Sequence, residues 1–247
     1  MVEVCVLIFL IMEEANNNIV DSFESSFLSD DKKDLLATIG DASLDAVIDN
    51  GALDGVPILG VLNGIYKVGK NIQTFRLCKK IASFLFVTSE ITQEDKDKFI
   101  QEYTVANKEK GAEVLLNVID KIDNINKIEY LANLMKAKVQ GQITIEDFVR
   151  LCFVIEKLPY VDFGNLQKYK QDCSEVGTDD ILLSTGVIYN SVIDANDGDK
   201  YKLNYIGNLL LRYGMGKDTD VNAPTPVSMP NMVSTKVLGD TLSFEEL

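Results

Sequence analysis

The chain has 247 residues, of which 46% are hydrophobic and 25% are charged, so it is long enough and apolar enough to bury a core. Twenty-four Lys and Arg stand against 38 Asp and Glu, which gives a net charge of −14, and the sequence contains no His. The lack of His excludes Ser–His and Cys–His catalytic pairs and metal sites built on imidazole. The acidity argues against wrapping a nucleic-acid backbone, because phosphate neutralisation needs Lys and Arg.

The first twelve residues, MVEVCVLIFLIM, form an apolar run that is too short to span a bilayer and lacks the basic start of a signal peptide. Three interpretations fit it: a buried strand or helix end, a short membrane-seeking anchor, or an upstream extension. We favour the extension, in which residues 1–11 precede a working start at Met12, because an ordinary acidic segment follows. Residues 13–29 then predict a short amphipathic helix, since apolar residues recur at helical spacing: Ile19, Val20, Phe23 and Phe27.

Residues 30–158 carry helical periodicity almost throughout, and we expect a helical bundle there. Thr92 and Thr144 are N-cap signals, and each has an acidic residue three positions further on, which is a variant of the capping box. The expected helices span residues 30–49, 57–86, 93–103, 110–122, 124–138 and 145–158.

The stretch ALDGVPILGVLNGIYKVGKNI, residues 52–72, is the most distinctive in the chain. Its glycines fit neither a Walker loop nor G-x-G-x-x-G, but Gly60 and Gly64 form a small-x-x-x-small pair that lets another helix approach closely. We favour a packing or oligomer surface; the alternative is a membrane-inserting hairpin whose cations stay near lipid headgroups. The candidate interaction residues are Pro57, Gly60, Gly64, Lys67, Gly69, Lys70 and Arg76.

The segment 159–216 predicts a small α+β unit. A short helix over 160–176 and a helical turn over 179–184 precede a β-branched run at 187–193, a hairpin turn at 194–199 and a strand at 200–203, and Asn204 then caps a last helix. Helix, strand, turn, strand and helix are the layout of the end of a winged-helix domain. The turn holds three Asp, which argues against DNA contact, and its register fails the EF-hand pattern.

The expected architecture is therefore mainly α: a helical bundle with a small winged-helix-like C-terminal unit. The domain organisation that we predict has four parts. They are an N-terminal extension (1–29), the bundle (30–158), the winged-helix-like unit (159–216) and a Pro-containing flexible tail (217–247).

A family resemblance rests on the glycine-rich stretch and on the end of the C-terminal unit. The chain resembles a large family of uncharacterised bacterial proteins over roughly residues 30–214. The resemblance implies a bacterial or phage origin and a link to phage–host conflict, and it brings no activity, cofactor or partner. The matching residues are Val56-Pro57-Ile58-Leu59, Lys67, Gly69, Ile72, Arg76, Lys80, Phe84-Leu85, Gly186-Val187-Ile188 and the run 201–210.

No motif for catalysis replaces the missing imidazole. The four cysteines form no C-x-x-C pair, no Ser lies in a nucleophile elbow, and we expect no enzyme activity, metal or cofactor. We predict a cytoplasmic, non-catalytic protein that acts through a protein partner or self-association. The alternatives are a membrane-associated effector that uses the glycine-rich segment and an acidic mimic of DNA.

Overall fold

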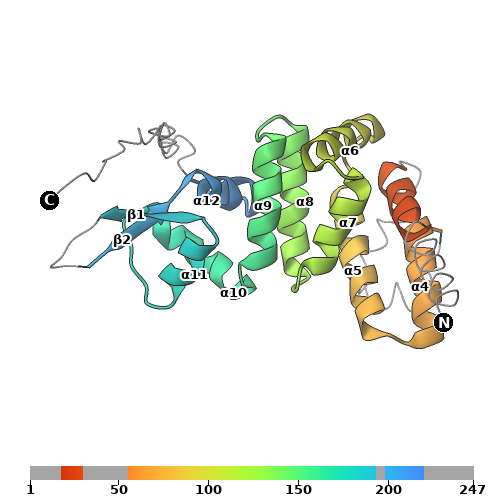
Figure 1. The fold of residues 1–247 in the computed structure, drawn as a ribbon, viewed down its shortest axis with the longest axis horizontal. Coiled ribbons are helices and arrows are strands. Elements are labelled where there is room, and N and C mark those ends of the chain that lie inside the picture. The colour runs from red at the N-terminus through yellow and green to blue at the C-terminus, as the bar shows by residue number, and fades with distance from the viewer. Residues whose placement is uncertain (1–17, 30–54, 193–197, 220–247) are drawn as a thin grey trace, which may run out of the picture.

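The computed structural model of the chain describes residues 18–29, 55–192 and 198–219. These residues are mainly helical, with one two-stranded antiparallel sheet near the C-terminus (Figure 1). The prediction of a mainly α protein with a small C-terminal sheet is thus confirmed. The expected helix over residues 30–49, the turn at 194–197, the run 1–12 and most of the tail lie outside the described residues.

The helices follow one another with short connections, as the periodicity predicts. An N-terminal helix spans residues 18–28. The labelled elements are α4 (Pro57–Gly69), α5 (Ile72–Val87), α6 (Gln93–Asn107), α7 (Gly111–Lys121), α8 (Asn126–Val139), α9 (Ile145–Lys157), α10 (Tyr160–Phe163), the 3-10 helix η1 (Gly164–Lys170), α11 (Thr178–Ser184), β1 (Ile188–Val192), β2 (Lys200–Leu203), α12 (Tyr205–Leu209) and the π-helix η2 (Leu210–Gly214).

Two predicted caps are confirmed. The Thr92 side chain accepts a hydrogen bond from the Asp95 amide at the start of α6. At the start of α9 the capping box is complete, because Thr144 accepts from the Asp147 amide while the Asp147 carboxylate accepts from the Thr144 amide. Such reciprocal bonds satisfy amides that the helix itself leaves unpaired.

The helical pattern that runs from Pro57 to Phe86 is divided between two helices, because the chain reverses direction after Gly69. Lys70 adopts a left-handed conformation (φ 45°) and its amide closes α4 on the Tyr66 carbonyl. The Asn71 side chain then caps α5 by accepting from the Gln73 amide at 2.8 Å. The apolar periodicity of the sequence continues across this turn, so the periodicity alone does not reveal that one helix ends and another begins here.

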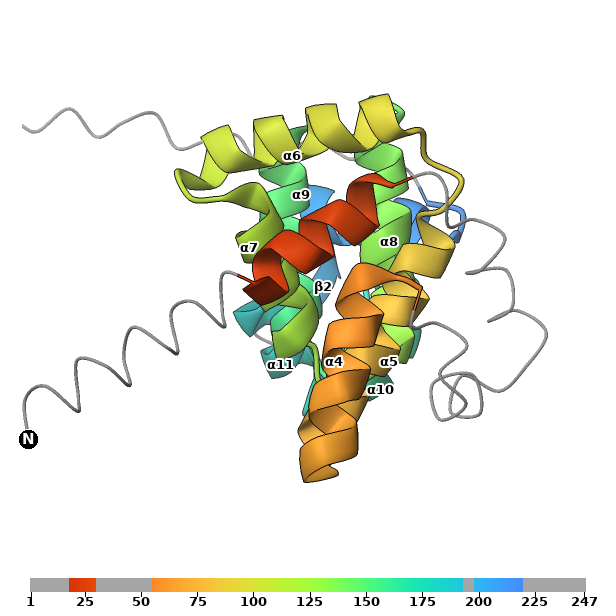
Figure 2. The same ribbon diagram turned by 90° about the vertical axis from the view of Figure 1, so that its right-hand side faces the viewer.

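The elements form an elongated body with different structures at its two ends. In Figure 1, α8 and α9 lie at the centre, the sheet lies at one end, and the α4–α5 hairpin lies at the other. Figure 2 shows α6 crossing over one end of the bundle, with the helix of residues 18–28 between α6 and α4. One hydrophobic core runs through all of them, from Val20 to Leu211, and is not interrupted at residue 29 or residue 158.

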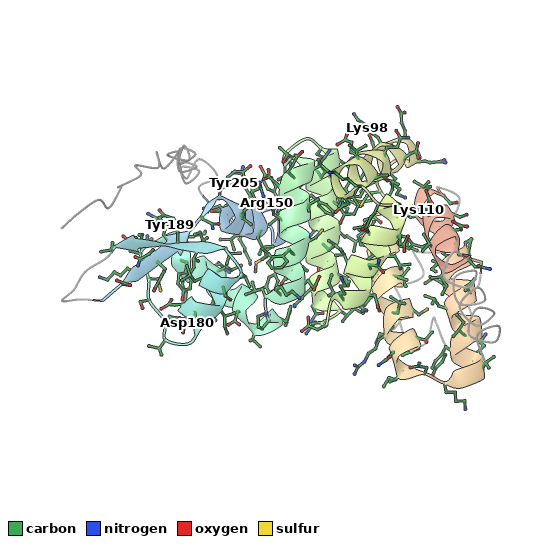
Figure 3. The ribbon with its side chains drawn as sticks, in the orientation of Figure 1. Lys98, Lys110, Arg150, Asp180, Tyr189 and Tyr205 are labelled. Carbon is green, nitrogen blue, oxygen red and sulfur yellow. The ribbon has the colours of Figure 1, made fainter. Side chains whose placement is uncertain are left out.

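The C-terminal sheet is joined to the bundle through polar contacts. In the sheet, Ile188 pairs with Leu203 and Asn190 with Tyr201. The Tyr205 hydroxyl at the start of α12 donates to the Asp147 carboxylate of α9 at 3.0 Å. Arg150, beside Tyr205 in Figure 3, approaches the same carboxylate at 3.6 Å. The unit is therefore fixed against α9.

Lysines buried in this acidic protein tie helix ends together. The Lys127 side chain, 1% exposed, donates from α8 to the Ile155 carbonyl of α9 at 3.1 Å and pairs with Asp123 at 2.6 Å. Its ammonium also lies 5.8 Å from the centre of the Phe163 ring. Cations favour carbonyl groups near helix C-termini, so these contacts fix the α8–α9 pair.

Replacing Lys127 with Ala is expected to lower the free energy of unfolding by about 2–3 kcal/mol, because it leaves a cavity and an unpaired carbonyl. Lys127→Met keeps most of the volume and should cost about 1 kcal/mol less. Urea denaturation followed by circular dichroism checks both variants against the exposed-site control Lys98→Ala. Equal midpoints for Lys127→Ala and the control would contradict this role.

Candidate functional site

The α4–α5 hairpin is anchored firmly at its base. Pro57 is the first helical residue of α4, where its fixed φ suits the first turn. Ile58 and Leu62 lie on the buried face of α4. The Ile58 amide donates to the Ser26 hydroxyl at 3.0 Å, which ties α4 to the helix of residues 18–28. These contacts leave the far end of the hairpin to project from the body, as Figure 1 shows.

The projecting end exposes aliphatic side chains. We call residues 65–72 the hairpin tip. Ile65, Val68 and Ile72 are 45%, 92% and 64% exposed, while the Tyr66 and Phe75 rings, with centroids 5.0 Å apart, hold the two arms of the hairpin together. The exposed aliphatic groups therefore stand on one ordered turn, which makes the hairpin tip a candidate contact site.

The charge of the hairpin is opposite to that of the whole chain. No Asp or Glu occurs from residue 55 to residue 89. Five cations lie in the same stretch of a chain whose net charge is −14: Lys67, Lys70, Arg76, Lys79 and Lys80. The hairpin thus combines exposed aliphatic side chains with a stretch of sequence that contains cations and no acidic residue.

The structure brings together part of the predicted candidate set. Lys67, Gly69 and Lys70 all lie in the exposed hairpin tip, and exposed Arg76 follows in the second turn of α5, whereas Pro57 and Gly60 are half-buried near the base. A Cβ added at Gly64 or Gly69 would meet no atom within 4 Å. Close packing against the described residues of the chain therefore does not occupy these two glycines, and the oligomer surface stays a prediction.

The sequence reasoning missed the exposed aliphatic residues of the tip, Ile65, Val68 and Ile72, as interaction candidates. They fit the helical periodicity of the stretch and were therefore indistinguishable from core residues. The available signal was the Gly69-Lys70-Asn71 sequence, since Gly and Asn are common where helices end and begin.

A polar pocket of about 640 Å³ lies between α5 and the loop that joins α7 to α8. Lys80 closes its inner side: the ammonium donates to the carbonyls of Asp120 and Ile122, the latter at 3.1 Å. Burial lowers the pKa of Lys80, against the opposing effect of the Asp120 charge. The residues that line the pocket are Gln73, Arg76, Lys79, Lys80, Asp120, Lys121, Ile122, Asp123, Asn124 and Ile125.

Cysteine chemistry finds no support in the core. Cys152 is buried on α9, and the Tyr103 hydroxyl lies 3.9 Å from its Sγ. Burial raises the pKa of the Cys152 thiol to about 12, so its reactive thiolate is suppressed. Burial, followed by the neighbouring Cys152, also raises the pKa of Tyr103. The pair behaves as part of the hydrophobic core.

These raised pKa values predict alkaline destabilisation. The folded protein keeps protons on Cys152 and Tyr103 that the unfolded chain loses near the ordinary pKa values of 9.0 and 10.0. Their stabilising contribution is thus complete below about pH 9 and is lost as the pH rises toward about 12. Urea denaturation at about pH 8 and about pH 10.5 should show a smaller alkaline loss for Tyr103→Phe than for the wild-type chain. An identical loss in both would contradict the assignment.

The function of the site has to be inferred from its own geometry, because comparisons with known proteins give no match. No protein-family model, curated protein or solved structure matches the chain. Within residues 18–29, 55–192 and 198–219, no helix has the length and apolarity needed to cross a membrane. The same residues place no group of three or more Cys, Asp or Glu side chains where a metal ion could be held.

Proposed function

We propose that the chain is a non-catalytic protein that attaches to an anionic membrane surface through the hairpin tip. The observation that carries this proposal is the projecting turn that exposes Ile65, Val68 and Ile72 in a stretch with five cations and no acidic residue. Each aliphatic side chain that leaves water contributes about 1.5–3 kcal/mol when its burial is complete. Each Lys or Arg near an anionic leaflet contributes about 1 kcal/mol.

The charge of the whole chain favours an end-on orientation. A body with a net charge of −14 is repelled by an anionic surface, whereas the hairpin is attracted to it. The hairpin lies at the end of the body opposite the sheet, and its tip projects beyond the neighbouring helices, so the tip can meet a surface first (Figure 1). The glycine-rich segment then contacts lipid from one side and does not span it.

Protein–protein contact, the function favoured from the sequence, is the competing proposal for the same surface. We favour a membrane because the aliphatic side chains of the tip are exposed on a projecting turn that also carries exposed Lys67 and Lys70. If the chain fails to bind anionic vesicles in the following experiment, an acidic protein partner becomes the favoured ligand of the hairpin tip.

Vesicle flotation of the full chain tests the proposal. We expect flotation with vesicles that contain phosphatidylglycerol, little flotation with pure phosphatidylcholine, and weakening at high salt, since salt screens attraction to the surface. Absence of flotation with the anionic vesicles at low salt would overturn the membrane proposal. Binding that is indifferent to lipid charge would overturn the role given to the cations.

We also propose that residues 159–216 form a winged-helix-like unit without a nucleic-acid function. The order of α11, β1, β2 and α12 supports this, as does the Asn204 side chain, which caps α12 by accepting from the Gly207 amide at 2.9 Å. Asp179 and Asp180 lie in the first turn of α11, where their negative charge repels the phosphates of DNA. A gel-shift titration with duplex DNA at low salt should show no complex, and a stable complex would contradict the proposal.

A further inference from the structure

The polar pocket between α5 and the α7–α8 loop has a composition suited to an anion. Its two carboxylates already have cationic partners, since Lys80 lies 3.8 Å from the Asp120 carboxylate and Lys127 lies 2.6 Å from that of Asp123. The lining also includes Arg76, Lys121 and Lys79, whose ammonium lies 5.7 Å from the centre of the Phe75 ring. The lining therefore holds more cations than carboxylates.

We infer that this pocket binds the phosphate monoester headgroup of an anionic lipid, an inference that rests on the proposed membrane function. A terminal phosphate presents three acceptor oxygens and up to two negative charges, so a lining with more cations than carboxylates attracts it more strongly than a phosphodiester, which carries one charge. Arg76 supplies a planar guanidinium able to bind two phosphate oxygens at once, and Lys79 and Lys121 supply single ammonium groups.

The size of the pocket indicates more than a bare phosphate. A volume of about 640 Å³ lies within the range of small-molecule sites and leaves room for the glycerol portion of a headgroup beside the phosphate. Gln73 and Asn124 lie in the lining and can hydrogen-bond a glycerol oxygen.

The position of the pocket relative to the hairpin tip favours a lipid as the source of the phosphate. Both Ile72 and Arg76 lie on α5, and a rise of 1.5 Å per residue places Arg76 about 6 Å and Lys79 about 10 Å along the helix from Ile72. If Ile72 enters the acyl boundary, these cations stand at about the depth of the headgroup layer. One hairpin thus presents its aliphatic tip to the acyl chains and its pocket to the phosphates.

Titration calorimetry of the full chain with monomeric lipids tests the inference without vesicles. The probes are short-chain dihexanoyl phosphatidic acid, dihexanoyl phosphatidylcholine, glycerol 3-phosphate and inorganic phosphate. We expect binding of the phosphatidic acid, at least about tenfold weaker binding of glycerol 3-phosphate and inorganic phosphate, and none of the phosphatidylcholine.

The double variant Arg76→Gln/Lys121→Gln should weaken binding of the phosphatidic acid at least about tenfold. The matched control Lys98→Gln/Lys170→Gln removes the same charge from two exposed lysines on α6 and η1 and should bind like the wild-type chain. Circular dichroism of each variant verifies folding. Equal weakening in both double variants would show a general charge effect and overturn the site.

The remaining outcomes separate the inference from the proposed function. Equal affinity for glycerol 3-phosphate and the short-chain phosphatidic acid would overturn the lipid assignment in favour of a free phosphate ester. No binding of either would overturn the pocket itself, while flotation on phosphatidylglycerol vesicles would still stand. Failure of flotation with preferential binding of monomeric phosphatidic acid would overturn the membrane function and leave the lipid preference of the pocket standing.

Discussion

Replacing Val68 and Ile72 together with Asp is expected to weaken binding to phosphatidylglycerol vesicles at least about 100-fold. Both side chains are exposed, at 92% and 64%, so the change disturbs no core packing. Burial of two aliphatic side chains in lipid is worth about 3 kcal/mol or more, and two carboxylates at an anionic surface add repulsion. A loss of about 1.4 kcal/mol corresponds to about tenfold in affinity, so the combined loss of affinity exceeds about 100-fold.

The matched control for this prediction is Val105→Asp/Val161→Asp. These valines, each 78% exposed, lie on α6 and α10, and the double change adds the same two negative charges. Quantitative flotation should show near-wild-type binding for the control and thermal denaturation should show both variants folded. Equal losses of binding in the two double variants would mean that net charge, and not the hairpin tip, governs attachment.

Gly207→Ala is expected to destabilise the fold by at least about 3 kcal/mol, the largest stability effect of any single glycine in the described residues. A Cβ at Gly207 would lie 2.1 Å from the Val187 carbonyl oxygen and 2.9 Å from Leu203 Cδ2. The carbonyl cannot withdraw easily, because it accepts a hydrogen bond from the Asn204 amide at 3.1 Å. The first turn of α12 and the backbone just before β1 are therefore in close contact, which only glycine at position 207 allows.

Gly64→Ala provides the comparison. Gly64 lies inside α4 with no atom near an added Cβ, and Ala in an exposed helix is more favourable than Gly by about 0.5–1 kcal/mol. Urea denaturation should therefore show a higher midpoint for Gly64→Ala and a much lower midpoint, or no folded protein, for Gly207→Ala. A wild-type midpoint for Gly207→Ala would contradict the close approach.

The fold was predictable where local chemistry decides it. The caps at Thr92, Thr144 and Asn204 are hydrogen bonds between residues three positions apart in the sequence. The buried apolar residues of α7 and α9 also recur at helical spacing. The reversal at Lys70 was not predictable from periodicity, because the apolar pattern runs through it unchanged. A left-handed conformation at a lysine has no side-chain signal of its own.

The candidate site was predictable only in outline. The sequence predicted that the stretch from Pro57 to Arg76 carries an interaction, from its glycines and cations, but exposure of Val68 depends on where the hairpin ends relative to the core. The pocket was beyond reach, because it joins residues 73–80 to residues 120–125, about forty positions apart. Only the packing of α5 against α7 and α8 brings these two segments together.

A tryptophan placed at the hairpin tip tests the central claim most directly. The chain contains no Trp, so Val68→Trp is a sole reporter, and Val105→Trp on α6 is its control at a similarly exposed position. On phosphatidylglycerol vesicles, Trp fluorescence of the Val68→Trp variant should shift to the blue and be quenched by brominated acyl chains, while that of Val105→Trp stays unchanged. An unshifted, unquenched signal from the Val68→Trp variant would contradict membrane attachment through the hairpin tip.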